Sequence, residues 1–232
     1  MSQNGSGPEP LSPPWREARE PAFNAPWPAL LLAAGLLGLF AWQQAAPNQD
    51  AVFYRFGLIP LTPDLGRRLL TSLFVHGNWA HVLMNAFGLL AFGAGVCRLF
   101  GVGPGGAAAF FAFFLVCGVL AGWGYLAVAD SGAVLIGASG GIAGLMAAAS
   151  RVLDRQRTGQ GRRLAPFTSP TVVSMAGAWL VVNLLIAVFG FAPGMEAVAV
   201  AWEAHLFGYA AGLLLIGPVF WALARLRGRA ID

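Results

Sequence analysis

The chain has 232 residues, of which 57% are hydrophobic and only 10% charged, and its mean hydropathy is +0.67. Soluble domains carry about 25% charged and about 45–50% apolar residues, so this composition excludes an ordinary soluble protein. The net charge of +4 comes entirely from arginines in loops beside apolar segments, not from a clustered basic face, so no nucleic-acid partner is expected. The chain is predicted to be an all-α integral membrane protein in contact with the lipid bilayer.

The N-terminal part divides into three segments. Residues 1–25 are polar and rich in Pro, Gly, Ser and Glu, which predicts a disordered cytoplasmic tail. A first span is expected at 28–46, in preference to a cleaved signal peptide, because the polar segment before it is long for a signal peptide and the apolar segment is long enough to cross a bilayer. Residues 47–75 are too polar to span and too hydrophobic for a solvated linker, so they predict a loop at the membrane surface.

Five more membrane spans are predicted, at about 78–100, 107–128, 134–150, 170–191 and 198–223. The fourth is short and rich in Gly and Ala, so we expect its neighbours to enclose it. The domain is expected to cover residues 26–224, followed by a cytoplasmic tail at 225–232. With six spans, all the arginines outside the 47–75 loop fall on one side, and the positive-inside rule makes that side cytoplasmic. Both termini are therefore expected inside, in what we take to be a bacterial inner membrane.

Reactive side chains stand out against this apolar background. Ser139 lies in IGASGGIAG, and two of the three histidines, His76 and His81, lie in HGNWAHVLMN with Asn85. The third, His205, lies in AWEAHLFGYAAG. Burying such groups in hydrocarbon is costly, so their presence suggests a function.

Ser139 and His205 are the pair that would carry acyl-transfer chemistry. A serine hydroxyl is a weak nucleophile until a base accepts its proton, and an imidazole titrates near neutrality. Glu203 is two residues from His205 and would point to the other side of a helix. We therefore expect a Ser–His dyad whose ring is held by packing or by an aromatic neighbour.

His81 and Asn85 are four residues apart and share one helix face. Together with the backbone N–H of Ser139 they could form an oxyanion hole. His76 lies five residues before His81 and is expected to tie the loop to the span. Small residues recur four apart, which favours close helix packing, at Gly137/Gly141, Gly140/Gly144 and Ala204/Gly208/Gly212.

Other interpretations remain open for each residue. A serine in a Gly-rich span is usually a packing residue, an intramembrane His can bridge helices, and an Asn can join them. No metal site is expected, because His76 and His81 are five apart with no Cys or nearby carboxylate to complete a first shell. Cys97 and Cys117 match no redox or metal motif and are interpreted as small core residues. No cofactor is expected.

At these motifs the chain resembles the rhomboid family of intramembrane serine proteases. HGNWAHVLMN, GASGGIAG and AHLFGYAAG are similar to the signatures of that family, in order on the second, fourth and sixth spans, and the resemblance covers roughly residues 28–223. It implies a six-transmembrane-helix bundle, with site roles as follows: Ser139 as nucleophile, His205 as base, His81 and Asn85 as oxyanion residues, and His76 as a structural histidine.

The resemblance also extends to the first loop. Arg68 is similar to the arginine of a Trp-Arg pair, with Arg67 at the position where Trp is common. Some members carry a Tyr four residues after the serine, stacked on the histidine, whereas this chain has Ala143, so the resemblance does not say what orients His205.

Two functions follow from this sequence. The first is an endopeptidase that cleaves transmembrane segments of other membrane proteins near the outer surface, with helix-destabilised single-pass segments as substrates. The alternative is a catalytically silent relative that binds membrane proteins, although such relatives lose the Ser or the His and this chain keeps both. A transporter is disfavoured because the chain shows no clear internal repeat.

Overall fold

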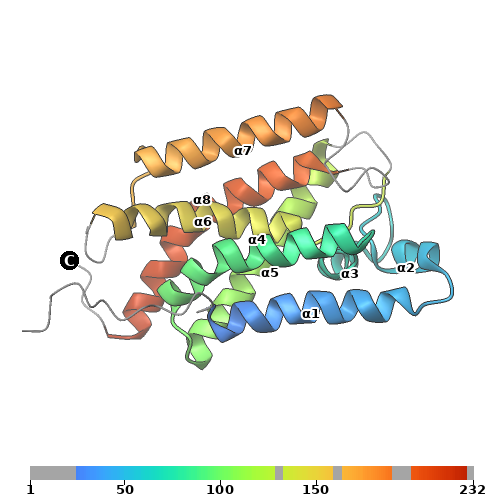
Figure 1. Ribbon diagram of the computed structural model, residues 1–232, viewed down its shortest axis with the longest axis horizontal. Helices are drawn as coiled ribbons and strands as arrows, with labels where there is room; N and C mark the ends of the chain where they lie inside the picture. The colour runs from blue at the N-terminus through green and yellow to red at the C-terminus, as the bar shows by residue number, and fades with distance from the viewer. Residues whose placement is uncertain (1–24, 129–132, 159–163, 190–199, 229–232) are drawn as a thin grey trace, which may run out of the picture.

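The computed structural model describes residues 25–128, 133–158, 164–189 and 200–228. These residues form a helical bundle (Figure 1) whose main helices are α1 (Trp27–Gln44), α4 (Trp79–Phe100), α5 (Pro104–Val128), α6 (Ser139–Thr158), α7 (Pro170–Phe189) and α8 (Trp202–Leu226). The all-α class predicted from composition is confirmed. The N-terminal tail, the basic segment around 159–163 and the start of the sixth predicted span lie outside the described residues.

Five of these helices, α1, α4, α5, α7 and α8, are long and apolar enough to cross a membrane. Helix α6 has a shorter apolar stretch, Ser139–Leu153. The protein is therefore a multi-pass integral membrane protein with a six-helix bundle of the kind the sequence predicted.

Helix α6 is the centre of the bundle. It packs against α4, α5, α7 and α8, and every residue from 140 to 150 is buried. Figure 1 shows α7 along one edge of the bundle and α1 along the opposite edge, with α6 between them. The expectation that the short Gly- and Ala-rich span is enclosed by its neighbours is confirmed.

The closest helix contact is between α6 and α8. A Cβ placed on Gly208 would lie 2.1 Å from the carbonyl oxygen of Gly140, and one on Gly212 would lie 2.0 Å from that of Gly144. The two backbones therefore touch at two successive turns, with both helices running in the same direction. Small residues four apart, singled out in the sequence on both spans, make this approach possible.

Residues 47–75 contain more regular structure than the term loop implies. They form α2 (Gln49–Phe56), α3 (Leu65–Thr71) and the 3₁₀ turn η1 (Ser72–Phe74). Asn48 caps α2 by accepting from the N–H of Ala51. Arg68 joins the two helices, because its guanidinium donates to the carbonyls of Tyr54 (2.6 Å) and Gly57 (2.9 Å) and to Asp64 (2.5 Å).

The fourth predicted span corresponds to α6, which begins five residues later than the sequence predicted. Residues 134–138 are not helical: Leu135 pairs with Leu58 through two backbone hydrogen bonds of 2.9 Å, and the N–H of Gly137 donates to the carbonyl of Ser72. Gly137 has a φ of +112°, a conformation that glycine adopts readily and other residues rarely adopt. The hydrophobicity of this segment reflects packing under the first loop, and Ser139 becomes the first residue of α6.

Gly208→Ala is predicted to destabilise the protein, because its methyl group would overlap the Gly140 backbone, which cannot move aside as a flexible side chain can. Overpacking of this kind typically costs about 1–3 kcal/mol. The measurement is the free energy of unfolding in mixed micelles. Gly35→Ala is the matched control, because a Cβ there meets no atom within 4 Å and should be neutral or slightly stabilising. Equal stability of the two variants would contradict the α6–α8 contact.

Candidate active site

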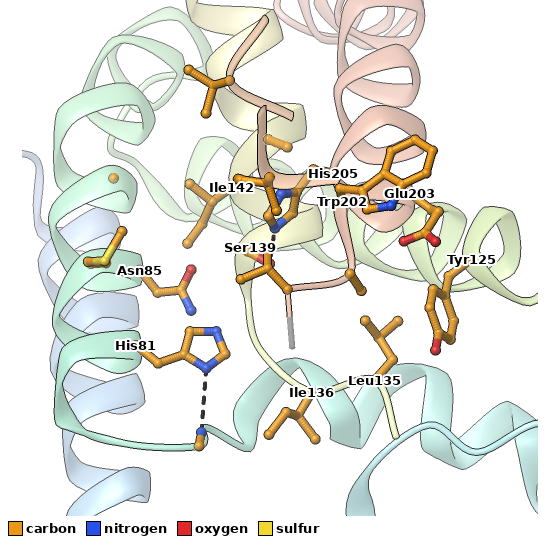
Figure 2. Close-up of a pocket in the computed structure, with 18 of the residues that line it drawn as sticks. His81, Asn85, Tyr125, Leu135, Ile136, Ser139, Ile142, Trp202, Glu203 and His205 are labelled. Carbon is orange, nitrogen blue, oxygen red and sulfur yellow. Dashed lines mark hydrogen bonds between the residues drawn. The ribbon is translucent and has the colours of Figure 1, made fainter. Parts of the chain in front are cut away.

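The α6–α8 contact brings Ser139 and His205 together. Ser139 is the first residue of α6 and His205 lies in the first turn of α8. The Oγ of Ser139 is 2.8 Å from Nε2 of His205, a hydrogen bond visible in Figure 2. His205 is buried, with 8% of its surface exposed. The geometry is that of a hydroxyl paired with a base.

The other ring nitrogen of His205 meets a residue that the sequence analysis missed. Nδ1 lies 3.0 Å from Oδ1 of Asn183 on α7. The amide nitrogen of Asn183 donates to the carbonyl of Trp179 (2.8 Å), which leaves its oxygen to face the imidazole. The ring of Trp179 is 5.6 Å from that of His205, centroid to centroid, and tilted by 41°. The expected aromatic neighbour is present, on α7.

His81 and Asn85 project from α4 toward Ser139 (Figure 2). Asn78 caps this helix by accepting from the N–H of His81 (2.8 Å). The helix therefore begins at Trp79, and His81 and Asn85 lie in its first two turns. Nδ1 of His81 accepts a long bond from the N–H of Gly77 (3.4 Å), which assigns the proton to Nε2. Nδ2 of Asn85 is buried and has no hydrogen-bond partner among the described residues. Two N–H donors are thus available on the side of Ser139.

Gly137 allows these donors to approach the start of α6. A Cβ at Gly137 would lie 2.6 Å from Nε2 of His81. Gly140, one residue after Ser139, is equally restricted, because a Cβ there would lie 2.5 Å from Cβ of Ala121. The sequence placed both glycines near the site, and the structure gives each one a close neighbour.

His76 is fully buried beside the site and belongs to the loop before α4. Its backbone N–H and carbonyl both bond the side-chain amide of Gln43 on α1, at 3.2 and 2.7 Å. Its ring packs edge-on against Phe40 and His81. Burial lowers the pKa of His76 to about 3, so the ring is neutral at physiological pH. Gln43, a buried amide in the last turn of α1, was not identified from the sequence.

A cavity of about 1020 Å³ opens over these residues. Ser139, His205, His81 and Asn85 lie on its wall, and the rest of the wall is largely apolar. Glu203 also lines it, on the side of Trp202 and Tyr125 (Figure 2). Within the described residues, no group of three His, Cys, Asp or Glu side chains is placed to hold a metal ion.

The sequence model of the rhomboid domain matches residues 65–222. Since the match covers well over half of the chain, the protein belongs to the rhomboid family. Members of this family are generally intramembrane serine proteases that act on membrane-protein substrates. No curated protein matches the chain.

Proposed function

We propose that this protein is an intramembrane serine endopeptidase that cleaves transmembrane segments of other membrane proteins. The observation that carries the proposal is the 2.8 Å hydrogen bond between Ser139 Oγ and His205 Nε2 inside a cavity of a membrane bundle. A packing serine has no need of an imidazole partner, and a histidine that only bridges helices has no need of a cavity beside it.

The first chemical step is attack on the scissile carbonyl. Ser139 Oγ bonds to the carbonyl carbon while His205 Nε2 accepts the hydroxyl proton, and the same nitrogen then gives that proton to the leaving amine. A water molecule then attacks the acyl carbon while His205 Nε2 accepts its proton. The bond from that carbon to Ser139 Oγ breaks, Oγ takes the proton from Nε2, and the acyl group leaves as a carboxylic acid. This second step needs water in the cavity, which explains why polar groups gather there.

The negative charge that develops on the carbonyl oxygen needs donors. Ser139 is the first residue of α6, so its backbone N–H has no partner within the helix and lies at the positive end of the helix dipole. Nε2–H of His81 and Nδ2–H of Asn85 face the same region from α4. These three groups form the proposed oxyanion hole.

The cavity supports a transmembrane segment as the substrate. Its apolar wall extends between α4 and α7 over the floor made by α6, with Phe92, Met146 and Val182 among its residues. Helices α4 and α7 do not pack directly on one another as α6 does on each of them. An apolar chain could lie in this space, and a segment that unwinds easily would present its backbone to Ser139.

The charge distribution supports a cytoplasmic location for both termini. The indole of Trp27 at the start of α1 donates to the carbonyl of Val102 (2.9 Å), and Arg227 at the end of α8 donates to the carbonyl of Phe100. One end of the bundle therefore gathers Arg98, Arg225 and Arg227, the cations expected inside. At the opposite end Arg67 and Arg68 both pair with Asp64, whose single carboxylate offsets one of their two charges.

Ser139→Ala is predicted to lower kcat for cleavage by roughly 10⁴–10⁶-fold and to leave the free energy of unfolding nearly unchanged. The measurement is cleavage of a labelled single-pass substrate in liposomes. His205→Ala should be equally inactive and the double variant no worse, because the two groups act as one unit. A fluorophosphonate probe should label the wild type alone. A wild type that binds the substrate without cleaving it would identify the silent alternative.

His81→Ala and Asn85→Ala are each predicted to lower kcat by about 10²–10³-fold, the usual effect of losing one oxyanion donor, with little change in KM. Leu83→Ala is the control, because its side chain lies on the same helix and is 52% exposed. A change confined to KM would assign the residue to substrate binding.

Single cysteines test the orientation of the protein. Leu61, in the first loop, and Leu226, at the end of α8, are 102% and 84% exposed. In intact cells an impermeant thiol reagent should label Leu61→Cys but not Leu226→Cys, and permeabilisation should expose the second. Cys97 and Cys117 are buried, so the wild type serves as the unlabelled control. Labelling of Leu226→Cys but not of Leu61→Cys in intact cells would show that the protein has the opposite orientation.

A further inference from the structure

Helix α7 is the least buried of the spanning helices. Only 11% of the most apolar stretch of α7 is buried inside the protein, compared with 28% of the corresponding stretch of α8 and 50% of that of α5. Among its residues only Val172 and Asn183 are buried, and Asn183 is completely inaccessible. A helix with an almost entirely exposed apolar surface therefore directs its single buried polar side chain at the site.

Asn183 completes a chain of hydrogen bonds that fixes the direction of each member. The Trp179 carbonyl can only accept, so the amide nitrogen of Asn183 donates to it and Oδ1 is left as an acceptor. Nδ1 of His205 must then carry the proton that it donates to Oδ1. Nε2 is left without a proton and accepts from Ser139. This is the tautomer that a general base requires.

We propose that Asn183 is a positioning residue that holds the His205 ring and its tautomer for the proton transfers at Ser139. The inference rests on the proposed peptidase function and assigns the residue that orients its base. Asn183 also remains an acceptor when His205 is protonated, so its bond persists through the transition state. Since the bond comes from α7, the alignment of His205 depends on α7 being seated against α6 and α8.

The competing explanation is that Asn183 only joins α7 to the bundle. Interhelical polar contacts in membranes are worth about 0.6–2 kcal/mol, so such a role is plausible on energy alone. The two explanations differ in what they require of the side chain. A joining role acts on the free energy of unfolding and leaves the rate of the folded enzyme unchanged, whereas a positioning role requires an oxygen acceptor at Oδ1 and acts on that rate.

Asn183→Leu and Asn183→Asp separate the two roles, because both keep the approximate size of asparagine and only Asp keeps the acceptor. For Asn183→Leu we expect kcat to fall about 10–100-fold, the loss typical of one buried hydrogen bond, with KM within about twofold of wild type. Asn183→Asp should recover most of kcat. The rate of fluorophosphonate labelling at Ser139 should follow the same order, because a small probe does not depend on substrate binding.

Leu184→Ala is the matched control on the adjacent, 59% exposed position of α7 and should match wild type. Unfolding is measured for each variant, so that rates refer to folded protein. The inference is overturned if Asn183→Leu keeps wild-type kcat, if Leu and Asp reduce it equally, or if only KM changes. A wild type that neither cleaves nor reacts with the probe would instead overturn the proposed function.

Discussion

The backbone contact between α6 and α8 is the constraint on which the site depends. Gly140 meets Gly208 and Gly144 meets Gly212 at distances that no side chain could occupy. Because the two helices run in parallel at this spacing, residues in the first turn of each are brought within hydrogen-bond reach, and these residues are Ser139 and His205. In hydrocarbon such an approach gains from packing rather than from excluding water, so small residues at a four-residue interval are its main requirement.

Around this contact some of the buried polar side chains are satisfied by hydrogen bonds between neighbouring helices and loops. Asn183 bonds His205 and its own helix, and Gln43 bonds both backbone groups of His76. An unpaired polar group in an apolar environment costs roughly 1–3 kcal/mol or more, so these pairs offset much of what the site would otherwise cost in stability. Nδ2 of Asn85 has no partner among the described residues, and neither do the ring nitrogens of His76 or Nε1 of Trp179. Asn85 projects toward Ser139 (Figure 2). An unpaired donor beside Ser139 is what an oxyanion hole needs before the charge arrives.

The sequence predicted the spans, the enclosed fourth helix and the grouping of Ser139, His205, His81 and Asn85, because glycine spacing and isolated polar residues are local signals. It did not predict the contribution of α7. Asn183 lies in a uniformly apolar span where a single amide indicates only that the helix has a buried face. Which group that amide meets depends on how α7 rotates against α8, and spacing within one helix does not encode that rotation. The late start of α6 was missed because residues 134–138 are as hydrophobic as the helix they precede.

The late start of α6 also determines the depth of the site. A helix rises about 1.5 Å per residue, so Ser139–Leu153 covers about 22 Å of the ~30 Å hydrocarbon core. If the end of α6 reaches one surface, Ser139 lies below the other, on the wall of the cavity. The non-helical residues 134–138 bridge that missing length, held to the first loop by Leu58 and Ser72. The first loop therefore does more than cover the bundle, because its backbone sets where α6 begins and so where the N-terminal N–H groups of α6 lie.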